Sequence, residues 1–349
     1  MYSDYLLASF GATTATGLSD LLEGEISHDQ VTRYLAGPQK TASDLWRTVK
    51  PFVREVQSEA GVLIIDDSIE EKPYTDENDI VCWHYDHSKD RLLKGSNFLT
   101  ALYASHGVSL PVGFHLVAKT EKYQDPKTQK EKRRSPVSKN EACQEVIKQA
   151  VTNFLPFRFV LFAVWFAAAE TLVFIKQHQH RDFICPLKTN RKVALSKADK
   201  QQGRYVRVDT LELEAQASRE IYLEGVDFPL VLVKQVCTNE DGSLGMRYLV
   251  SSDTTVSFAG LTTTYHERWG VACYHKSLNQ NVSLAKSPTQ TVTTQTTHFF
   301  AAPCGFIKWE RLKGKTQLNH FALKSKLYLN ALHSAFSTLR ALTPVQGPA

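Results

Sequence analysis

The segment from Thr264 to Gln280, TYHERWGVACYHKSLNQ, holds the side chains of this sequence that are best suited to bind phosphate. It reads as one helix with a polar row along one side. At 3.6 residues per turn, tyrosine, arginine and lysine on one line favour a phosphate-binding surface over a core stripe. A small, inert alanine interrupts the row. Its members are Tyr265, Arg268, Ala272, Lys276 and Asn279.

Two acidic residues follow the first strongly apolar segment. Residues 61–65, GVLII, predict a strand buried on both faces, and this run ends in Asp66 and Asp67. Acids directly after a buried strand lie at the sheet edge, where α/β active sites are usually built. A second apolar strand, Phe157 to Phe162, ends in Ala163 instead. The sequence therefore repeats the strand geometry without repeating the acid.

Composition sets broad limits on function and location. The 349 residues carry a net charge of +5, which permits a polyanionic partner without requiring one. Six cysteines are scattered singly, which favours a reducing compartment. The N-terminus does not resemble a signal peptide, and the longest apolar run, Phe157 to Ala169, is shorter than the ~20 residues that span a bilayer. We therefore expect a cytoplasmic protein with no membrane partner.

The pattern along the chain predicts an α/β fold with helical ends. Residues 1–58 read as short helices around a turn, one of them capped by Ser27, and form either a small DNA-binding head or a helical cap on a larger domain. Ser138 and Glu141 predict a capping box. Apolar alternation predicts further strands at 81–87, 98–105 and 112–118, and again at 205–208, 221–223, 230–237 and 246–251.

Basic residues are concentrated in two segments. Residues 119–139 read as a polar loop, either simply solvated or in contact with DNA. Residues 183–255 read as a β-rich insertion whose first half is basic. Its candidate DNA-binding residues are Lys188, Arg191 and Lys192.

A zinc site is a weak alternative at the second predicted strand. Cys82, His84 and His87 are ligand types, but no second ligand cluster completes the set. Ordinary strand residues are the simpler interpretation.

The order of these parts resembles the bacterial insertion-sequence DDE transposases. The similarity covers about Ile64 to Asn279. It is carried by the strand ending in D-D-S, the second strand followed by F-x-x-W-F, the β-rich insertion, and the helix with Tyr265 and Arg268 at the spacing of the Y-x2-R-x3-E-x6-K signature group. The resemblance implies an RNase H-like mixed sheet with flanking helices and a cut-and-paste transposase that binds transposon ends.

The resemblance also implies a site and partners. Three carboxylates from separate elements would hold two Mg²⁺ or Mn²⁺ ions, because in-line attack on a phosphodiester needs one metal at the nucleophile and one at the leaving oxygen. Asp67, or its neighbour Asp66, would be the first acid and a metal ligand; we favour Asp67 because a serine follows it. Tyr265 and Arg268 would hold backbone phosphate. Double-stranded DNA with terminal repeats and a homodimer in the DNA complex are the implied partners.

The sequence departs from the signature at its chemical positions. Ala163 stands at the second acid, Ala272 at the third, and Asn279 at the signature lysine. An alanine cannot ligate a metal, so we predict a catalytically inactive protein, a pseudoenzyme. Engineered inactivation would normally change only the carboxylates, whereas Asn279 also departs and Pro303 would interrupt an apolar helix. That pattern is typical of a copy drifting without selection for transposition.

Two alternatives and a domain division complete the prediction. The chain could be a transposase-derived DNA-binding protein that inhibits active relatives, or an unrelated RNase H-like nuclease that uses Asp66, Asp67 and Glu170. The expected division is a DNA-binding region at 1–58, the first part of the core at 59–182, the insertion at 183–255, and a closing helix with a helical C-terminal region at 256–349.

Overall fold

The computed structural model describes residues 1–86, 89–214, 216–238 and 241–342. The chain splits into two compact units. The larger is Thr41–Cys273, and the smaller joins Met1–Lys40 to the chain from Tyr274 onward. Their boundary falls within helix α9 (Trp269–Asn281). The division expected from the sequence, at residues 58, 182 and 255, remains a prediction.

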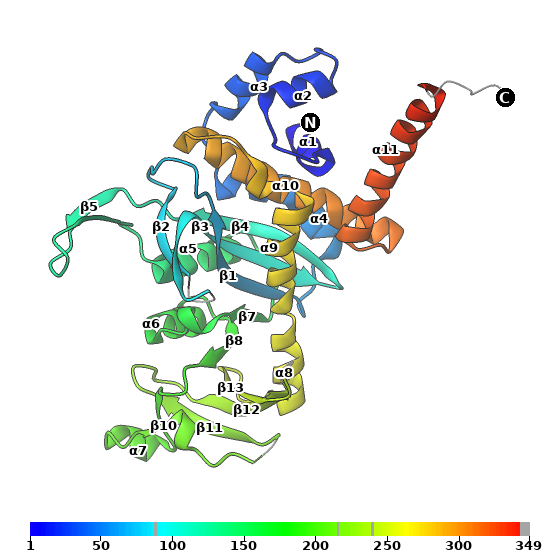
Figure 1. The fold of residues 1–349 in the computed structure, drawn as a ribbon. Helices are drawn as coiled ribbons and strands as arrows, with labels where there is room; N and C mark the ends of the chain where they lie inside the picture. The colour runs from blue at the N-terminus through cyan, green and yellow to red at the C-terminus, as the bar shows by residue number, and fades with distance from the viewer. Residues whose placement is uncertain (87–88, 215, 239–240, 343–349) are drawn as a thin grey trace. The chain divides into compact units, whose positions relative to one another are not determined.

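A mixed sheet forms the core of the larger unit (Figure 1). Within the described residues it has eleven strands in the order β10-β9-β11-β12-β13-β8-β7-β1-β3-β2, with β4 paired to β3. Strand β1 (Val62–Glu71) runs parallel to β7 (Phe159–Phe162) and antiparallel to β3 (Arg91–Ser105). The other strands are β2 (Cys82–Asp86), β4 (Val108–Leu116), β8 (Asp182–Leu187), β9 (Lys192–Ala194), β10 (Val206–Arg207), β11 (Ser218–Leu223), β12 (Leu230–Thr238) and β13 (Leu244–Ser251).

Strand β1 is longer than the sequence predicts. Its apolar half is fully buried, as the run of β-branched residues indicates, and so are all four residues of β7. The prediction that the strand ends at the acids is wrong, because Asp66 and Asp67 continue to pair with Thr100 and Leu99 of β3. Only the pairing with β7 stops before them, at Ile65.

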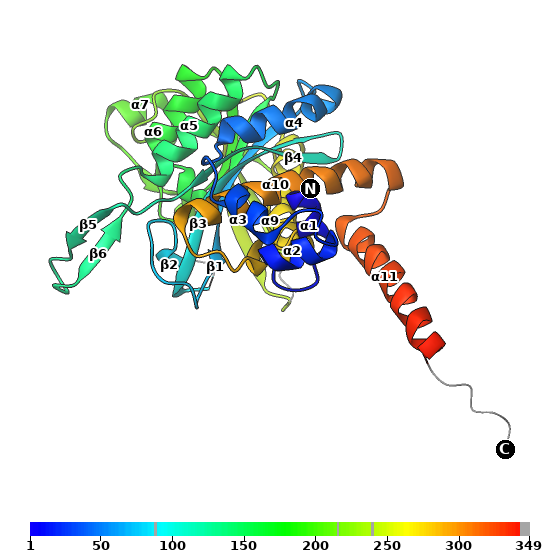
Figure 2. The same cartoon turned by 90° about the horizontal axis from the view of Figure 1, so that it is seen from above.

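Helices cover both faces of this sheet (Figure 2). Side chains alternate along β1, so Ile64 and Asp67 point to opposite faces. Gly270 of α9 lies over Ile64, whereas Lys139 of α5 (Lys139–Thr152) bonds to Asp67. The predicted capping box starts α5. The remaining helices of this unit are α4 (Ala42–Val56), α6 (Ala169–Val173), α7 (Lys197–Gln201) and α8 (Phe258–His266). The arrangement confirms the predicted α/β class with an RNase H-like core.

Segment 119–139 contains a two-stranded ribbon, so the prediction of a loop throughout is wrong. Strands β5 (Glu121–Gln124) and β6 (Glu131–Arg134) form a separate two-stranded sheet among the described residues, and this sheet projects away from the main sheet in both views (Figures 1 and 2). The alternation in this ribbon is of charged and polar residues, which is why apolar periodicity did not reveal it.

The smaller unit is helical. It contains α1 (Tyr2–Ala8), α2 (Ala15–Leu21), α3 (His28–Leu35), α10 (Val292–Thr316) and α11 (His320–Leu342). Pro303 lies inside α10, which runs through it without a break, so the expected interruption is wrong. The proline is buried in the packed middle of this long helix, and that packing offsets the lost hydrogen bond. No helix among the described residues is long and apolar enough to cross a membrane.

We expect Gly95→Ala to destabilise the larger unit by about 1–3 kcal/mol, because a methyl group there would lie 2.1 Å from the Glu70 carbonyl oxygen of the neighbouring strand. Gly113→Ala is the matched control in β4, since its methyl group would meet Ala101 at an ordinary 3.5 Å. Urea unfolding of both variants measures the difference. Equal stability of the two would contradict the close approach at Gly95.

Candidate functional site

Asp66 and Asp67 lie on opposite faces of the sheet. The carboxylate of Asp66 accepts a hydrogen bond from the Arg268 guanidinium at 3.0 Å. Asp67 instead accepts from Lys139 and, at 3.2 Å, from the Asn97 amide. The sequence preference for Asp67 as the first acid remains a prediction, but the geometry places Asp66, not Asp67, on the face of Arg268.

Burial dominates the electrostatics of Asp66. It raises the pKa of this carboxyl to about 6, although the Arg268 charge acts in the opposite direction. The neighbouring Asp67 adds to the increase. Asp66 is therefore a desolvated acid with one arginine partner.

Ala163 directly follows β7 with an extended backbone, at the register position next to Asp66 of β1. Phe162 of β7 pairs with Ile65 of β1, and Ala163 and Asp66 directly follow that pair. Neighbouring residues in register on parallel strands project to the same face, so the Ala163 methyl group shares the face of the Asp66 carboxylate. Ala163 also begins a 3₁₀ turn, Val164–Phe166, without a side-chain hydrogen bond to cap it.

The segment predicted as one helix is two helices. Glu267 and Arg268 form a turn between α8 and α9, in which the Arg268 amide bonds to the Tyr265 carbonyl three residues back, at 3.1 Å. This tighter turn interrupts the straight row that the sequence predicts. Ala272 is exposed on α9, and Lys276 and Asn279 belong to the smaller unit.

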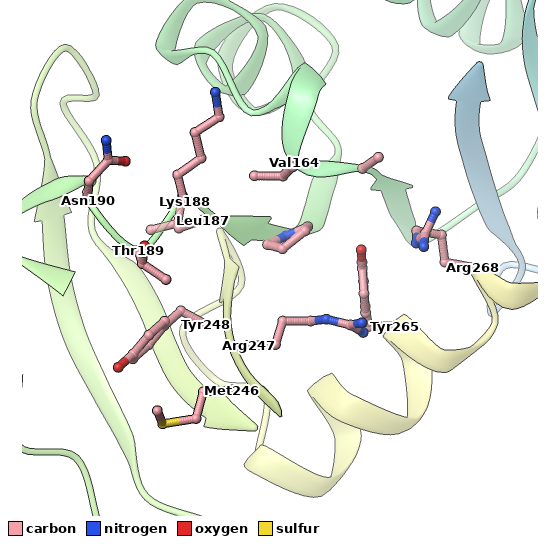
Figure 3. Close-up of a pocket in the computed structure, with 12 residues that line it drawn as sticks. Val164, Leu187, Lys188, Thr189, Asn190, Met246, Arg247, Tyr248, Tyr265 and Arg268 are labelled. Atoms are coloured by element: carbon pink, nitrogen blue, oxygen red, sulfur yellow. The ribbon is translucent and has the colours of Figure 1, made fainter. Parts of the chain in front are cut away.

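A cavity of about 620 Å³ opens beside Ala163 (Figure 3). Tyr265, Arg268 and Arg247 of β13 line it, and the Arg247 side chain extends toward Tyr265. The guanidinium groups of Arg247 and Arg268 lie 5.8 and 5.7 Å from the centre of the Tyr265 ring. Further lining residues are Val164, Pro186, Leu187, Lys188, Thr189, Asn190, Met246 and Tyr248.

Tyr265 is fixed as a neutral donor. Its hydroxyl donates to the Phe162 carbonyl oxygen at 3.4 Å, and burial raises its pKa to about 12. The ring thus holds the two guanidinium groups near the end of β7, where Ala163 lies.

The cavity has an excess of positive charge. Arg268 is paired with Asp66, but Lys188 and Arg247 have no ion-pair partner within the described parts of the chain. Lys188 lies over the Trp165 ring, with its ammonium group 4.6 Å from the ring centre. Lys188 and Arg191 also line a second cavity of about 160 Å³, whereas Lys192 lines neither. The chemistry of the larger cavity fits an anion with several oxygen acceptors.

Sequence reasoning missed Arg247. In the sequence it is only a single arginine in the predicted strand Met246–Ser251, whose last four residues are buried, and nothing near it marks it as part of a site. Only the pairing of β13 with β8 brings that arginine to the end of β7.

The residues present do not fit a two-metal site. Such a site needs carboxylates converging from separate elements. Among the residues that the structure describes, no three His, Cys, Asp or Glu side chains are grouped to hold a metal ion. Asp66 is bonded to Arg268 instead, and Glu170 is exposed on α6. The structure therefore does not bring together the three acids of the alternative nuclease, which are Asp66, Asp67 and Glu170.

Two of the three candidate ligands of the alternative zinc site, Cys82 and His84, lie within the described residues. The Cys82 thiol and the His84 Nε2 atom are 3.3 Å apart and both side chains are buried. Burial lowers the pKa of His84 to about 3 and raises that of Cys82, so the two groups meet as a neutral thiol and a neutral imidazole. His87 lies outside the described residues.

The large mixed sheet and its flanking helices place the chain among the α/β proteins with an RNase H-like core. The family profile of the DDE superfamily endonucleases matches residues 1–208, more than half of the chain, and the chain belongs to that family. No curated protein matches it. DDE superfamily endonucleases generally use divalent metals and act on DNA.

Proposed function

We propose that this chain is a cut-and-paste DDE transposase by descent that binds double-stranded DNA at transposon ends but does not cleave it. The proposal depends mainly on one observation: Ala163 lies beside an Asp66 that is already bonded to Arg268. A methyl group there offers no ligand, and the third expected ligand position, Ala272, offers none either.

DNA binding without cleavage is supported by the cavity beside Ala163. Lys188 and Arg247, which have no ion-pair partner in the part of the chain that the structure describes, line this space of about 620 Å³, which is large enough for a sugar–phosphate segment. Phosphate contacts of this kind position DNA without reading its sequence. The same property would let the chain act as an inhibitor, by occupying the ends used by active relatives or by joining their dimers.

The charge distribution favours the larger unit as the DNA-binding part. Residues 1–32 contain five acidic residues and no lysine or arginine. Four of the acids, Asp20, Glu23, Glu25 and Asp29, are exposed around α2 and α3. A phosphate backbone would be repelled there, so DNA contacts within the expected region 1–58 would have to come from its later, basic part.

We expect Arg247→Gln to weaken binding of duplex DNA about ten-fold, since it removes one charge-assisted phosphate contact. Fluorescence anisotropy with labelled duplexes at several salt concentrations measures the effect. Arg219→Gln, at an exposed arginine of β11, is the control with the same change in charge. An equal loss in both variants would mean that only net charge matters and that the cavity is not the phosphate site.

The absence of cleavage is tested on the unchanged protein. Supercoiled plasmid carrying candidate terminal repeats is incubated with the protein and Mg²⁺ or Mn²⁺. We expect retarded DNA and no nicked circles. Nicking that Asp67→Ala abolishes would instead support the alternative nuclease.

A further inference from the structure

We propose that the ribbon β5–β6 is a DNA-binding arm that lies in the major groove of duplex DNA. This inference rests on the proposed function, which it deepens by naming a second contact surface outside the cavity. It starts from charge: residues 119–134 contain seven basic and three acidic residues, a net charge of +4 in a short segment.

The acids of the ribbon are all engaged by its own cations. Glu131 pairs with Lys122, Glu121 with Arg134, and Asp125 with Lys132. The Lys122–Glu131 and Arg134–Glu121 pairs are solvent-exposed, and exposed ion pairs contribute little to stability. Their cations can therefore exchange a carboxylate for a DNA phosphate at little cost.

The tip presents two further cations on an ordered turn. The Asp125 carboxylate accepts hydrogen bonds at 2.9 Å from the amides of Lys127 and Thr128. Gln129, with φ of 55°, closes the turn in the left-handed region. Lys127 and Lys130 are exposed and have no ion pair within the described residues. They are the positions from which the ribbon would first meet a phosphate.

The base of the ribbon is fixed to the larger unit. Arg133 bonds to the Asp79 carboxylate at 2.8 Å, and the Lys119 amide donates to the Asp79 carbonyl at 2.7 Å. Five residues after Arg134, Lys139 bonds to Asp67. That stretch can span at most about 18 Å, so the arm starts close to the acids of β1.

The exposed side chains of the ribbon favour a nucleic acid over a protein as its partner. Within residues 119–134 no large apolar side chain is strongly exposed, whereas protein interfaces need an apolar or aromatic centre. A two-stranded ribbon fits the ~12 Å major groove of B-DNA. The deep, narrow major groove of duplex RNA does not admit one. Duplex DNA is therefore the partner that the arm fits.

The experiment compares two double variants of the full chain by DNA anisotropy over a range of salt. Lys127→Gln/Lys130→Gln removes the tip charges, and Lys148→Gln/Lys197→Gln removes two exposed charges elsewhere. We expect the slope of log affinity against log salt to fall by about two in the tip variant and to stay unchanged in the control. Lys127→Arg/Lys130→Arg should keep the original slope, and methylation protection of guanine N7 should be lost only in the tip Gln variant.

Two outcomes would contradict the proposal that the ribbon β5–β6 binds DNA. One is an unchanged slope in the tip variant, and the other is an equal fall in both Gln variants. If Arg247→Gln still weakens DNA binding in either case, only the proposal for the ribbon is rejected and the cavity remains the proposed DNA site. If the unchanged protein does not bind duplex DNA at all, the proposed function fails as well.

Discussion

Restoring Ala163→Asp together with Ala272→Glu is expected to give a protein that nicks DNA at least about 100-fold faster than the unchanged chain. Replacing two missing carboxylates should recover several kcal/mol of transition-state stabilisation, and each 1.36 kcal/mol is a factor of ten in rate. The measurement is conversion of supercoiled plasmid to nicked circles with Mg²⁺ or Mn²⁺. Asn279→Lys is added as a separate variant, because the signature that the sequence resembles has a lysine at this position.

Both restored positions can accept the larger side chain. Ala163 is partly exposed on the cavity wall and begins a 3₁₀ turn that lacks a side-chain cap, and aspartate is a good capping residue. Ala272 is exposed on α9, where glutamate is a good helix former. Ala163→Asn/Ala272→Gln has almost the same shape without the charges and serves as the control. Equal nicking by the unchanged and restored proteins would contradict the account of the site.

The restored protein also distinguishes the two candidate first acids. Asp66→Asn in that background should abolish nicking, because Asp66 shares a face with Ala163. Asp67→Asn should leave much of it, because Asp67 lies on the opposite face with Lys139. The reverse result would support the preference drawn from the serine that follows Asp67.

Local sequence was sufficient for the elements that local physics determines. Residues 62–65 and 159–162 of the two predicted apolar strands lie buried in β1 and β7, the predicted cap Ser27 begins α3, and the predicted capping box at Ser138 begins α5. These signals depend on residues within a few positions of one another.

The features that decide the site depend on distant pairing. Asp66 and Asp67 stay in β1 because β3, about 30 residues later, pairs with them. The face that each acid occupies follows from that register, and a shift of one residue would exchange them. Arg247 reaches the cavity only through the order of β13, β8 and β7. No local pattern encodes these placements, so the sequence named Tyr265 and Arg268 but neither Arg247 nor the Asp66–Arg268 pair.

The buried carboxyl of Asp66 should make the stability of the protein decrease as the pH rises. The folded-state pKa of Asp66, about 6, is above its ordinary value of 3.8, because burial disfavours the charged form. The folded state therefore holds this proton more tightly than the unfolded state does. The stabilisation that Asp66 contributes is fully present below about pH 3.8 and is lost as the pH rises toward 6.

Asp66→Asn removes this titration, so the variant should gain stability relative to the unchanged protein as the pH rises. A change of about two pKa units corresponds to about 3 kcal/mol, and we expect the difference in free energy of unfolding to move by that amount between pH 4 and 7. Urea unfolding of both proteins across this range measures it. A difference that stays constant with pH would mean that Asp66 is not the desolvated acid described above.

Asp253→Asn is the matched control, because the pKa of Asp253 is shifted in the opposite direction from that of Asp66. Burial alone would raise the pKa of Asp253, but hydrogen bonds from Thr255 and Arg158 outweigh burial and lower it. Its contribution is therefore present above about pH 4 and lost at lower pH, so replacing it should cost stability at neutral pH and less in acid. Opposite trends in the two variants would separate an acid whose pKa is governed by burial from one whose pKa is governed by its hydrogen bonds. Parallel trends would indicate a general effect of removing one negative charge.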